Sequence, residues 1–208
     1  MTVLYHPPYD SPIENRFAMW FAKYADDSIT LTSQVNASTL CGLFVLDFVL
    51  EDDNGYRVGI ECDGKEYHCE NRDEWRDAMI LGGGHIDVIY RLRGVDINYR
   101  IEDCLYLLAK LEPSFFSERR LHGLVDLASD EVLRRSPIHK ESMHVIRYQN
   151  GPDIESLIIE VRRTAISKDF RWFWRSLYEY GLSVGGGHLD DVMLSYREKQ
   201  DQRGDDFI

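Results

Sequence analysis

The sequence predicts an α/β fold, with one sheet flanked by helices and a mostly helical C-terminal extension. Apolar residues near the N-terminus recur every three or four positions, which is the period of an amphipathic helix. Two apolar runs, 43–50 and 56–63, are joined by a turn containing Asn-Gly, which indicates a hairpin. A helical segment then separates the second run from another apolar run. This strand, helix, strand order implies a crossover unit and a parallel strand pair.

The first helix is expected at about residues 12–25. Ser11 has the form of an N-cap, Pro12 stands at the first helical position, and Glu14 completes a capping box. Behind this start, a core-facing stripe recurs at spacings of three or four and consists of Ile13, Phe17, Trp20, Phe21 and Tyr24.

The sheet is expected to begin with residues 29–35, which alternate polar and apolar side chains. The run 43–50 is apolar on both faces except at Asp47, as in a central strand. The remaining elements of the core follow in order: a strand at 56–63, a helix at 72–81 stopped by three glycines, a strand at 86–92 and a helix at 97–111. The resulting order is helix, three strands, helix, strand, helix.

The second half of the chain gives weaker signals. We expect a helix at 124–135, a further strand at 143–148, one or two helices within 153–182, and a frayed polar end over the last dozen residues. We therefore divide the chain into a core, 1–112, and a mostly helical extension, 113–208.

Composition limits the class of protein. The 208 residues, 44% of them hydrophobic, suffice for one sizeable core and a smaller appendage. No segment approaches the roughly 20 apolar residues of a membrane helix, and the N-terminus does not read as a secretion signal. We expect a cytoplasmic protein without a membrane partner. Its irregularly spaced cysteines are then expected to be reduced thiols: Cys41, Cys62, Cys69 and Cys104.

The net charge of −12 is spread unevenly. Residues 1–112 hold 20 acidic and 10 basic residues, for −10, whereas residues 113–208 carry only −2. An acidic protein repels phosphate backbones at long range. Nucleic-acid binding would therefore require local basic patches, bound metal ions or a basic protein partner.

Three acids are expected to share one small space. Glu61 and Asp63 project from the same face of a strand, and the antiparallel neighbour brings Asp47 beside them. At an effective dielectric constant of about 20, two carboxylates about 4 Å apart repel by roughly 4 kcal/mol. Protons, basic side chains or a divalent cation must neutralise such a cluster. Because Mg²⁺ is usually held by one or two carboxylates plus substrate phosphate, the cluster suggests a phosphate-processing metal site.

A purely structural interpretation is also open. Asp63 and Gly64 can simply end the strand in a turn, with Glu61 paired to Arg57 or Arg76. Asp47 favours the functional interpretation, because an acid between apolar neighbours has a desolvation cost that a surface acid does not.

Together these residues resemble the PD-(D/E)XK nuclease superfamily. The likeness consists of Glu14 in a first helix, Asp47 in VLDFVL, the phrase IECDGKEYH at 60–68, a glycine-ended helix and the strand VIYRLRG. It covers about residues 11–111 and is closest to the very-short-patch-repair-like branch. It implies a restriction-endonuclease-like core and Mg²⁺-dependent or Mn²⁺-dependent hydrolysis of phosphodiester bonds, above all in DNA.

The resemblance also implies roles for individual residues. Asp47 and Glu61 would bind the metal, the carbonyl of Cys62 would be a further ligand, and Glu14 would approach directly or through water. His68 would be a general base or a phosphate contact, since an imidazole titrates near neutral pH.

The sequence departs from the superfamily at one catalytic position. The usual lysine, two residues after the second acid, is Asp63 here. Lys65 or His68 would have to take over its part, and both alternatives remain open. Cys62, His68 and Cys69 also suggest zinc, but no second pair of ligands with suitable spacing accompanies them.

Several residues are candidates for nucleic-acid contacts. Gln34 would support the site from the first strand, and Arg72 and Arg76 lie on the helix that follows the motif. The segment 170–181 interleaves arginine with aromatic residues, which suits phosphate contacts and base stacking, although core packing also explains its aromatic residues. The candidate phosphate contacts in the second half are Arg162, Arg163, Lys168, Arg171 and Arg175.

The sequence therefore predicts a metal-dependent endonuclease that acts on DNA, alone, as a homodimer or with a basic protein partner. The alternative is a nuclease-fold module that binds nucleic acid or protein without cutting, which the missing lysine and the acidic charge favour. A third possibility is a defence or toxin effector that is active only in a complex.

Overall fold

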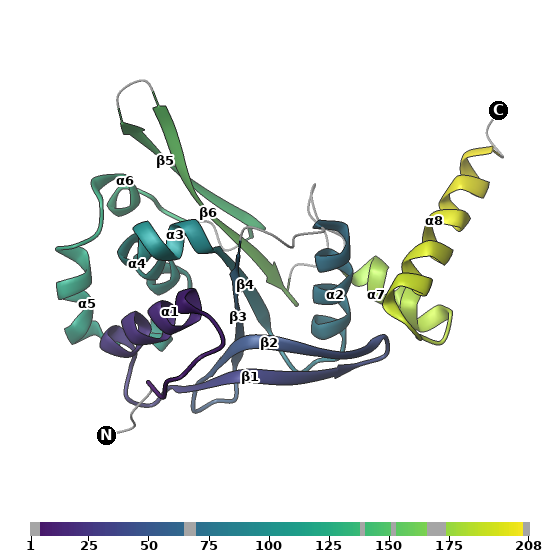
Figure 1. The fold of residues 1–208 in the computed structure, drawn as a ribbon, viewed down its shortest axis with the longest axis horizontal. Coiled ribbons are helices and arrows are strands. Elements are labelled where there is room, and N and C mark those ends of the chain that lie inside the picture. The colour runs from purple at the N-terminus through teal and green to yellow at the C-terminus, as the bar shows by residue number, and fades with distance from the viewer. Residues whose placement is uncertain (1–4, 65–69, 138–139, 151–152, 166–173, 206–208) are drawn as a thin grey trace.

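The computed structural model describes residues 5–64, 70–137, 140–150, 153–165 and 174–205. Over these residues the chain has an α/β fold, with a mixed sheet of six strands in the order β1-β2-β3-β4-β6-β5 and helices on both faces (Figure 1). The elements are α1 (Pro12–Tyr24), β1 (Thr30–Thr39), β2 (Gly42–Glu51), β3 (Arg57–Asp63), α2 (Glu70–Gly82), β4 (Val88–Arg93), α3 (Gly94–Tyr99), α4 (Ile101–Leu111), a 3₁₀ turn (Pro113–Phe115), α5 (Glu118–Val125), α6 (Asp130–Leu133), β5 (Met143–Asn150), β6 (Asp153–Arg163), α7 (Trp174–Ser183) and α8 (Leu189–Asp205).

The sheet contains the predicted crossover. β1, β2 and β3 pair antiparallel, and β3 then pairs parallel to β4 through α2, with Glu61 beside Arg91 in the ladder. Because the parallel strands run together, their carboxyl ends lie at one edge of the sheet, beside the first turns of α2 and α3. Ligands of open α/β sheets bind at such edges.

Two layers of helices bury the two faces of the sheet (Figure 1). On one face, α1 and α4 pack onto the strands through residues such as Phe17, Phe48 and Leu105. On the other face, α2 and α7 cover residues such as Leu46 and Ile89. Phe48 and Leu50 of β2 belong to the first core and Val49, between them, to the second, so this strand supplies both cores, as expected for a central strand.

The helix predicted at 97–111 is two helices. α3 ends at Tyr99. The next residue, Arg100, has a φ of −143° and a ψ of 36°, which lie outside the helical region, and α4 begins directly after it. The helix predicted at 124–135 is likewise replaced by the shorter helices α5 and α6.

The prediction of helix at 153–163 was wrong, because these residues form β6. Leu157, Ile159 and Val161 are buried at every second position, which is the period of a strand. β6 pairs antiparallel with β4, so the sheet continues across the boundary expected at residue 112. The part of the extension that contains β5 and β6 belongs to this sheet and is not helical. The expected fraying of the last dozen residues is also not seen up to Asp205, where α8 ends.

Two further expectations can be compared with the described residues. Cys41, Cys62 and Cys104 are buried free thiols, as predicted, whereas Cys69 lies outside the described residues. Within the described part of the chain, none of the helices combines the length and apolar character needed to cross a membrane.

Candidate active site

Asp47 reaches from β2 onto the backbone of β3. The ladder between these strands has Phe48 opposite Ile60 as its pair nearest this edge. Beyond it, Oδ2 of Asp47 accepts the peptide N–H of Cys62 at 2.7 Å. The carboxylate therefore satisfies a donor that would otherwise be buried without a partner, and it is held beside Glu61.

Glu14 approaches from the first turn of α1. Ser11 Oγ donates to Glu14 Oε1 at 2.6 Å and accepts the N–H of Glu14 at 3.2 Å, which confirms the predicted N-cap. The side chain is only 6% exposed, and its other oxygen, Oε2, accepts from Gln34 Nε2 at 3.2 Å. Glu14 thus belongs to the helix cap and points inward toward the strands, where the positive end of the helix favours a carboxylate.

Gln34 marks an irregularity in β1. The pairs Ser33 with Phe48 and Val35 with Leu46 flank it, so Gln34 stands opposite Asp47. Its φ of +52° is uncommon for a residue other than glycine. The local kink turns the amide toward Glu14, which is consistent with the supporting position predicted for Gln34.

The electrostatics of Asp47 and Glu61 indicate incomplete neutralisation. Burial raises the pKa of Asp47 to about 6. The carboxylates of Glu14 and Asp63 raise it further, whereas the hydrogen bond from the Cys62 N–H and the charge of Arg76 lower it. Burial raises the pKa of Glu61 to about 8, with Asp47 adding to the rise while Arg76 and Arg91 oppose it. Additional positive charge at this position would therefore stabilise the ionised acids.

Arg76 provides part of that charge. From α2, its Nη2 lies 2.5 Å from Glu61 Oε1 and donates to the carbonyl oxygen of Val45 at 2.7 Å. The pairing of Glu61 with Arg76, which the sequence left open as the structural alternative, is therefore present. Arg76 is turned into the site and is not free for a phosphate contact in this conformation.

Asp63 belongs to a separate ion-pair network. Its Oδ1 lies 3.1 Å from Nη1 of Arg91. The Nε and Nη2 atoms of the same arginine donate to Asp77 at 2.9 and 3.1 Å. Asp77 is fully buried and Arg91 is 5% exposed. The residue at the usual lysine position is thus held by a structural pair. Arg91 and Asp77 were not predicted as a pair, although the position of Arg91 between Tyr90 and Leu92 in an apolar strand indicated that a buried acid must lie opposite it.

The carboxylate oxygens of Asp47 and Glu61 are the type of ligand atom that a divalent cation such as Mg²⁺ prefers. Asp47 and Glu61 each keep one carboxylate oxygen that neither Cys62 nor Arg76 uses. Mg²⁺ needs only one or two carboxylates, because it keeps several waters. Among the described residues, however, no three His, Cys, Asp or Glu side chains are close enough to ligate one ion together.

Four other predicted site residues are outside the described part of the chain: Lys65, His68, Lys168 and Arg171. Arg72 is exposed at the start of α2 and forms a 3.1 Å pair with Asp190 of α8.

The arginines of the second half are largely engaged within the protein. Arg163 pairs with Glu112 at 2.8 Å, and Arg162 pairs with Glu160 at 2.7 Å. The two arginines lie on strand β6 and not on the expected helix. Arg175 lies with its guanidinium 5.1 Å from the ring centre of Trp174. The positions of Arg162 and Arg163 do not favour phosphate contacts, because both side chains are largely buried.

Comparisons of the chain with protein-family models, curated proteins and solved structures find no match. The likeness to the nuclease superfamily consequently depends on the motif residues, their spacing and the order of the elements.

Proposed function

We propose that this chain is a metal-dependent phosphodiester hydrolase with a restriction-endonuclease-like core, and that its substrate is DNA. The observation that carries the proposal is that Asp47, on β2, lies close enough to interact electrostatically with Glu14, on α1, and with Glu61, on β3, at the carboxyl edge of the parallel strands. The raised pKa values of Asp47 and Glu61 support it, because acids gathered for structure alone are usually neutralised by their partners. The order helix, three strands, helix, strand, helix also agrees.

Each acid has a distinct part in this proposal. Asp47 and Glu61 would hold Mg²⁺ or Mn²⁺, with the carbonyl of Cys62 as a further oxygen donor. A bound divalent cation polarises the scissile phosphate and lowers the pKa of bound water. Glu14, fixed by Ser11 and Gln34, completes the negative field that attracts the cation. Lys65 and His68 remain the proposed groups for proton transfer.

Arg76 has two positions in the proposal. In the structure it neutralises Glu61. A cation held by Glu61 would leave the guanidinium of Arg76 free at the edge of the site, where its planar donors would suit two phosphate oxygens.

A cleavage assay tests the proposal directly. Supercoiled plasmid and end-labelled DNA and RNA strands are incubated with the protein and increasing Mg²⁺ or Mn²⁺. We expect metal-dependent cleavage that Asp47→Ala abolishes. The matched control is Asp53→Ala, which removes an exposed acid from the turn after β2. Equal cleavage by Asp47→Ala and the wild-type chain would contradict the mechanism.

Binding of nucleic acid without cleavage is the second candidate. The Arg76–Glu61 pair favours it, because the pair already neutralises part of the acid cluster, and so does the engagement of Asp63 by Arg91. A pure binder would retain a labelled oligonucleotide in the presence of Mg²⁺ and Mn²⁺ and yield no product.

A further inference from the structure

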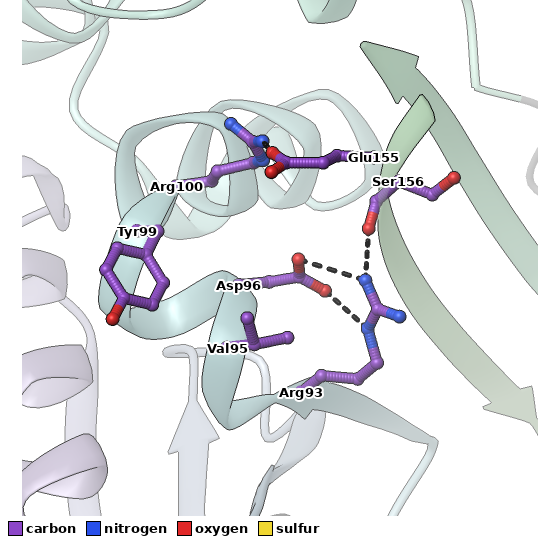
Figure 2. Close-up of a pocket in the computed structure, with 7 residues that line it drawn as sticks. All are labelled: Arg93, Val95, Asp96, Tyr99, Arg100, Glu155 and Ser156. Carbon is purple, nitrogen blue, oxygen red and sulfur yellow. Dashed lines mark hydrogen bonds and ion pairs between the residues drawn. The ribbon is translucent and has the colours of Figure 1, made fainter. Parts of the chain in front are cut away.

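A pocket of about 570 Å³ opens between α3 and the first residues of β6 (Figure 2). Its volume lies within the range of small-molecule sites. Arg93 and Arg100 contribute guanidinium groups to its lining, and Val95 and Tyr99 contribute apolar and aromatic surface. These residue types suit a ligand that combines an anionic group with a flat ring.

Arg93 is fixed in place but keeps donors to spare. Its Nε and Nη2 donate to Asp96 at 2.7 and 3.1 Å, and Nη2 also donates to the carbonyl oxygen of Ser156 (Figure 2). Asp96 is 2% exposed and also accepts the N–H of Ile158 at 3.1 Å, so the pair is rigid. Within the described part of the chain, Nη1 of Arg93 takes part in none of these bonds, and a guanidinium has five N–H donors.

Arg100 repeats this arrangement on the other side of the pocket. Its Nη2 pairs with Glu155, and its guanidinium lies 4.0 Å from the ring centre of Tyr148. Neither contact engages Nε or Nη1. Two positively charged groups are thus held by their neighbours, and each keeps N–H donors that no other described residue uses, which is the arrangement that phosphate recognition needs.

Tyr99 supplies an aromatic surface that the fold does not use. It is 79% exposed, whereas most aromatic rings described in the structure are packed, and Val95 on the same helix is 38% exposed. Both extend from the helix that carries Asp96 (Figure 2). An exposed ring next to arginines is the combination with which proteins stack a nucleotide base and bind its phosphate.

The pocket adjoins the candidate active site. Arg93 is the ladder partner of Asp63 on β3, and a Cβ at Gly94 would lie 3.2 Å from the carbonyl oxygen of Asp63 and 3.2 Å from Ile13 Cδ1. The wall of the pocket therefore packs on the end of β3 and on the first turn of α1. One strand spacing and two residues separate the backbones of Arg93 and Glu61, which amounts to about 8 Å.

We propose that this pocket binds one nucleotide of the substrate next to the bond that is cut, with its phosphate on Arg93 and Arg100 and its base against Tyr99 and Val95. The assignment as a flanking subsite rests on the proposed function. Asp96 and Glu155 offset the two arginines, so a free mononucleotide binds weakly and the same unit within a strand binds more tightly.

Binding measurements in EDTA test the pocket apart from catalysis. The full chain is titrated with deoxyadenosine monophosphate by NMR and with a fluorescent 12-nucleotide DNA strand by anisotropy. We expect Tyr99→Ala to weaken both at least about fivefold and Tyr99→Phe to retain them, because stacking needs the ring. Leu127→Ala, which removes another exposed apolar side chain, is the control and leaves both unchanged.

The outcomes separate the two proposals. Unchanged affinities for Tyr99→Ala would overturn the pocket assignment, even if the wild-type chain cleaves DNA. Competition by inorganic phosphate as effective as by the mononucleotide would also overturn it, since the base would then contribute nothing. A third outcome is that the wild-type chain binds the mononucleotide but cleaves neither DNA nor RNA, and that Tyr99→Ala loses this binding. That result would support the nucleotide site and contradict the proposed hydrolase activity.

Discussion

Arg76 and Glu61 form an ion pair in which Nη2 and Oε1 lie 2.5 Å apart, in the same small space that receives the carboxylate of Asp47. The two side chains are 15% and 6% exposed, so both charges have lost most of their water. Attraction between the pair offsets that desolvation only while both partners are present. Any cation that binds Glu61 must therefore compete with Arg76.

At pH 9, where Glu61 with its pKa of about 8 is ionised, replacing Arg76 by alanine is expected to destabilise the metal-free chain by about 3–5 kcal/mol, because the carboxylate is left buried without its partner. A divalent cation would restore the missing positive charge. Thermal unfolding with and without Mg²⁺ measures this, and the rise in Tm on adding Mg²⁺ should be larger in Arg76→Ala than in the wild-type chain.

Arg134→Ala is the matched control. Arg134 pairs with Asp130 on α6, where the side chains are 74% and 72% exposed. Its loss should cost less than about 0.5 kcal/mol and create no response to Mg²⁺. If Mg²⁺ raises the Tm of Arg76→Ala no more than that of this control, Glu61 is not a cation ligand.

Asp47→Asn separates the charge of this residue from its structural hydrogen bond. The amide oxygen can still accept the N–H of Cys62, while the repulsion from Glu14 and Asp63 disappears. We expect undiminished or increased stability at pH 8 and loss of metal-dependent cleavage. Urea unfolding and the plasmid assay measure the two effects, and a large loss of stability would show that Asp47 acts in the fold through its charge.

The pH dependence of stability follows from the same acids. Unfolded carboxyls release their protons near the ordinary pKa values of 3.8 for Asp47 and 4.5 for Glu61, whereas the folded groups keep theirs to about pH 6 and 8. In that window the folded chain binds more protons, so its stability falls as the pH rises. Without divalent cation, these two groups should lower the unfolding free energy by an amount on the order of a few kcal/mol between pH 4 and 8.

Urea unfolding at several pH values in EDTA measures that decline. The slope should be smaller in the Asp47→Asn variant, which lacks one of the two titrating groups, and unchanged in Asp53→Ala. A stability that rises through this range in the wild-type chain, and equally in both variants, would mean that Asp47 and Glu61 are already neutralised.

Much of the fold could be predicted because periodicity is a local property of the sequence. The stripe at Phe17 and Phe21 identified α1, and the apolar runs around Asp47 and Ile60 identified β2 and β3. β6 was missed because residues 157–159 are apolar at consecutive positions, a pattern that fits a helix as well as a strand. Its assignment as a strand depends on pairing with β4, which is distant in sequence.

The site could be predicted only where strand geometry determines it. Neighbouring antiparallel strands place Asp47 near Glu61 whatever the rest of the chain does. The partners supplied by α2 depend on how that helix is rotated against the sheet, which local sequence does not specify. The sequence therefore left Arg76 open as a partner of Glu61 and gave no indication that Asp77 would meet Arg91.

Arg91 links β4 to α2 and is expected to matter more for stability than for chemistry. Its replacement by methionine keeps most of the side-chain volume but leaves Asp77 fully buried without its two hydrogen bonds, and it removes the ion pair between Arg91 and Asp63. We expect a loss of about 3–5 kcal/mol in urea unfolding, an order of magnitude above the surface control Arg134→Ala. Combining Arg91→Met with Asp77→Leu should recover much of this loss, because both charges of the pair are then gone. A double variant no more stable than Arg91→Met would indicate that Asp63, and not Asp77, is the partner on which the stability of this network depends.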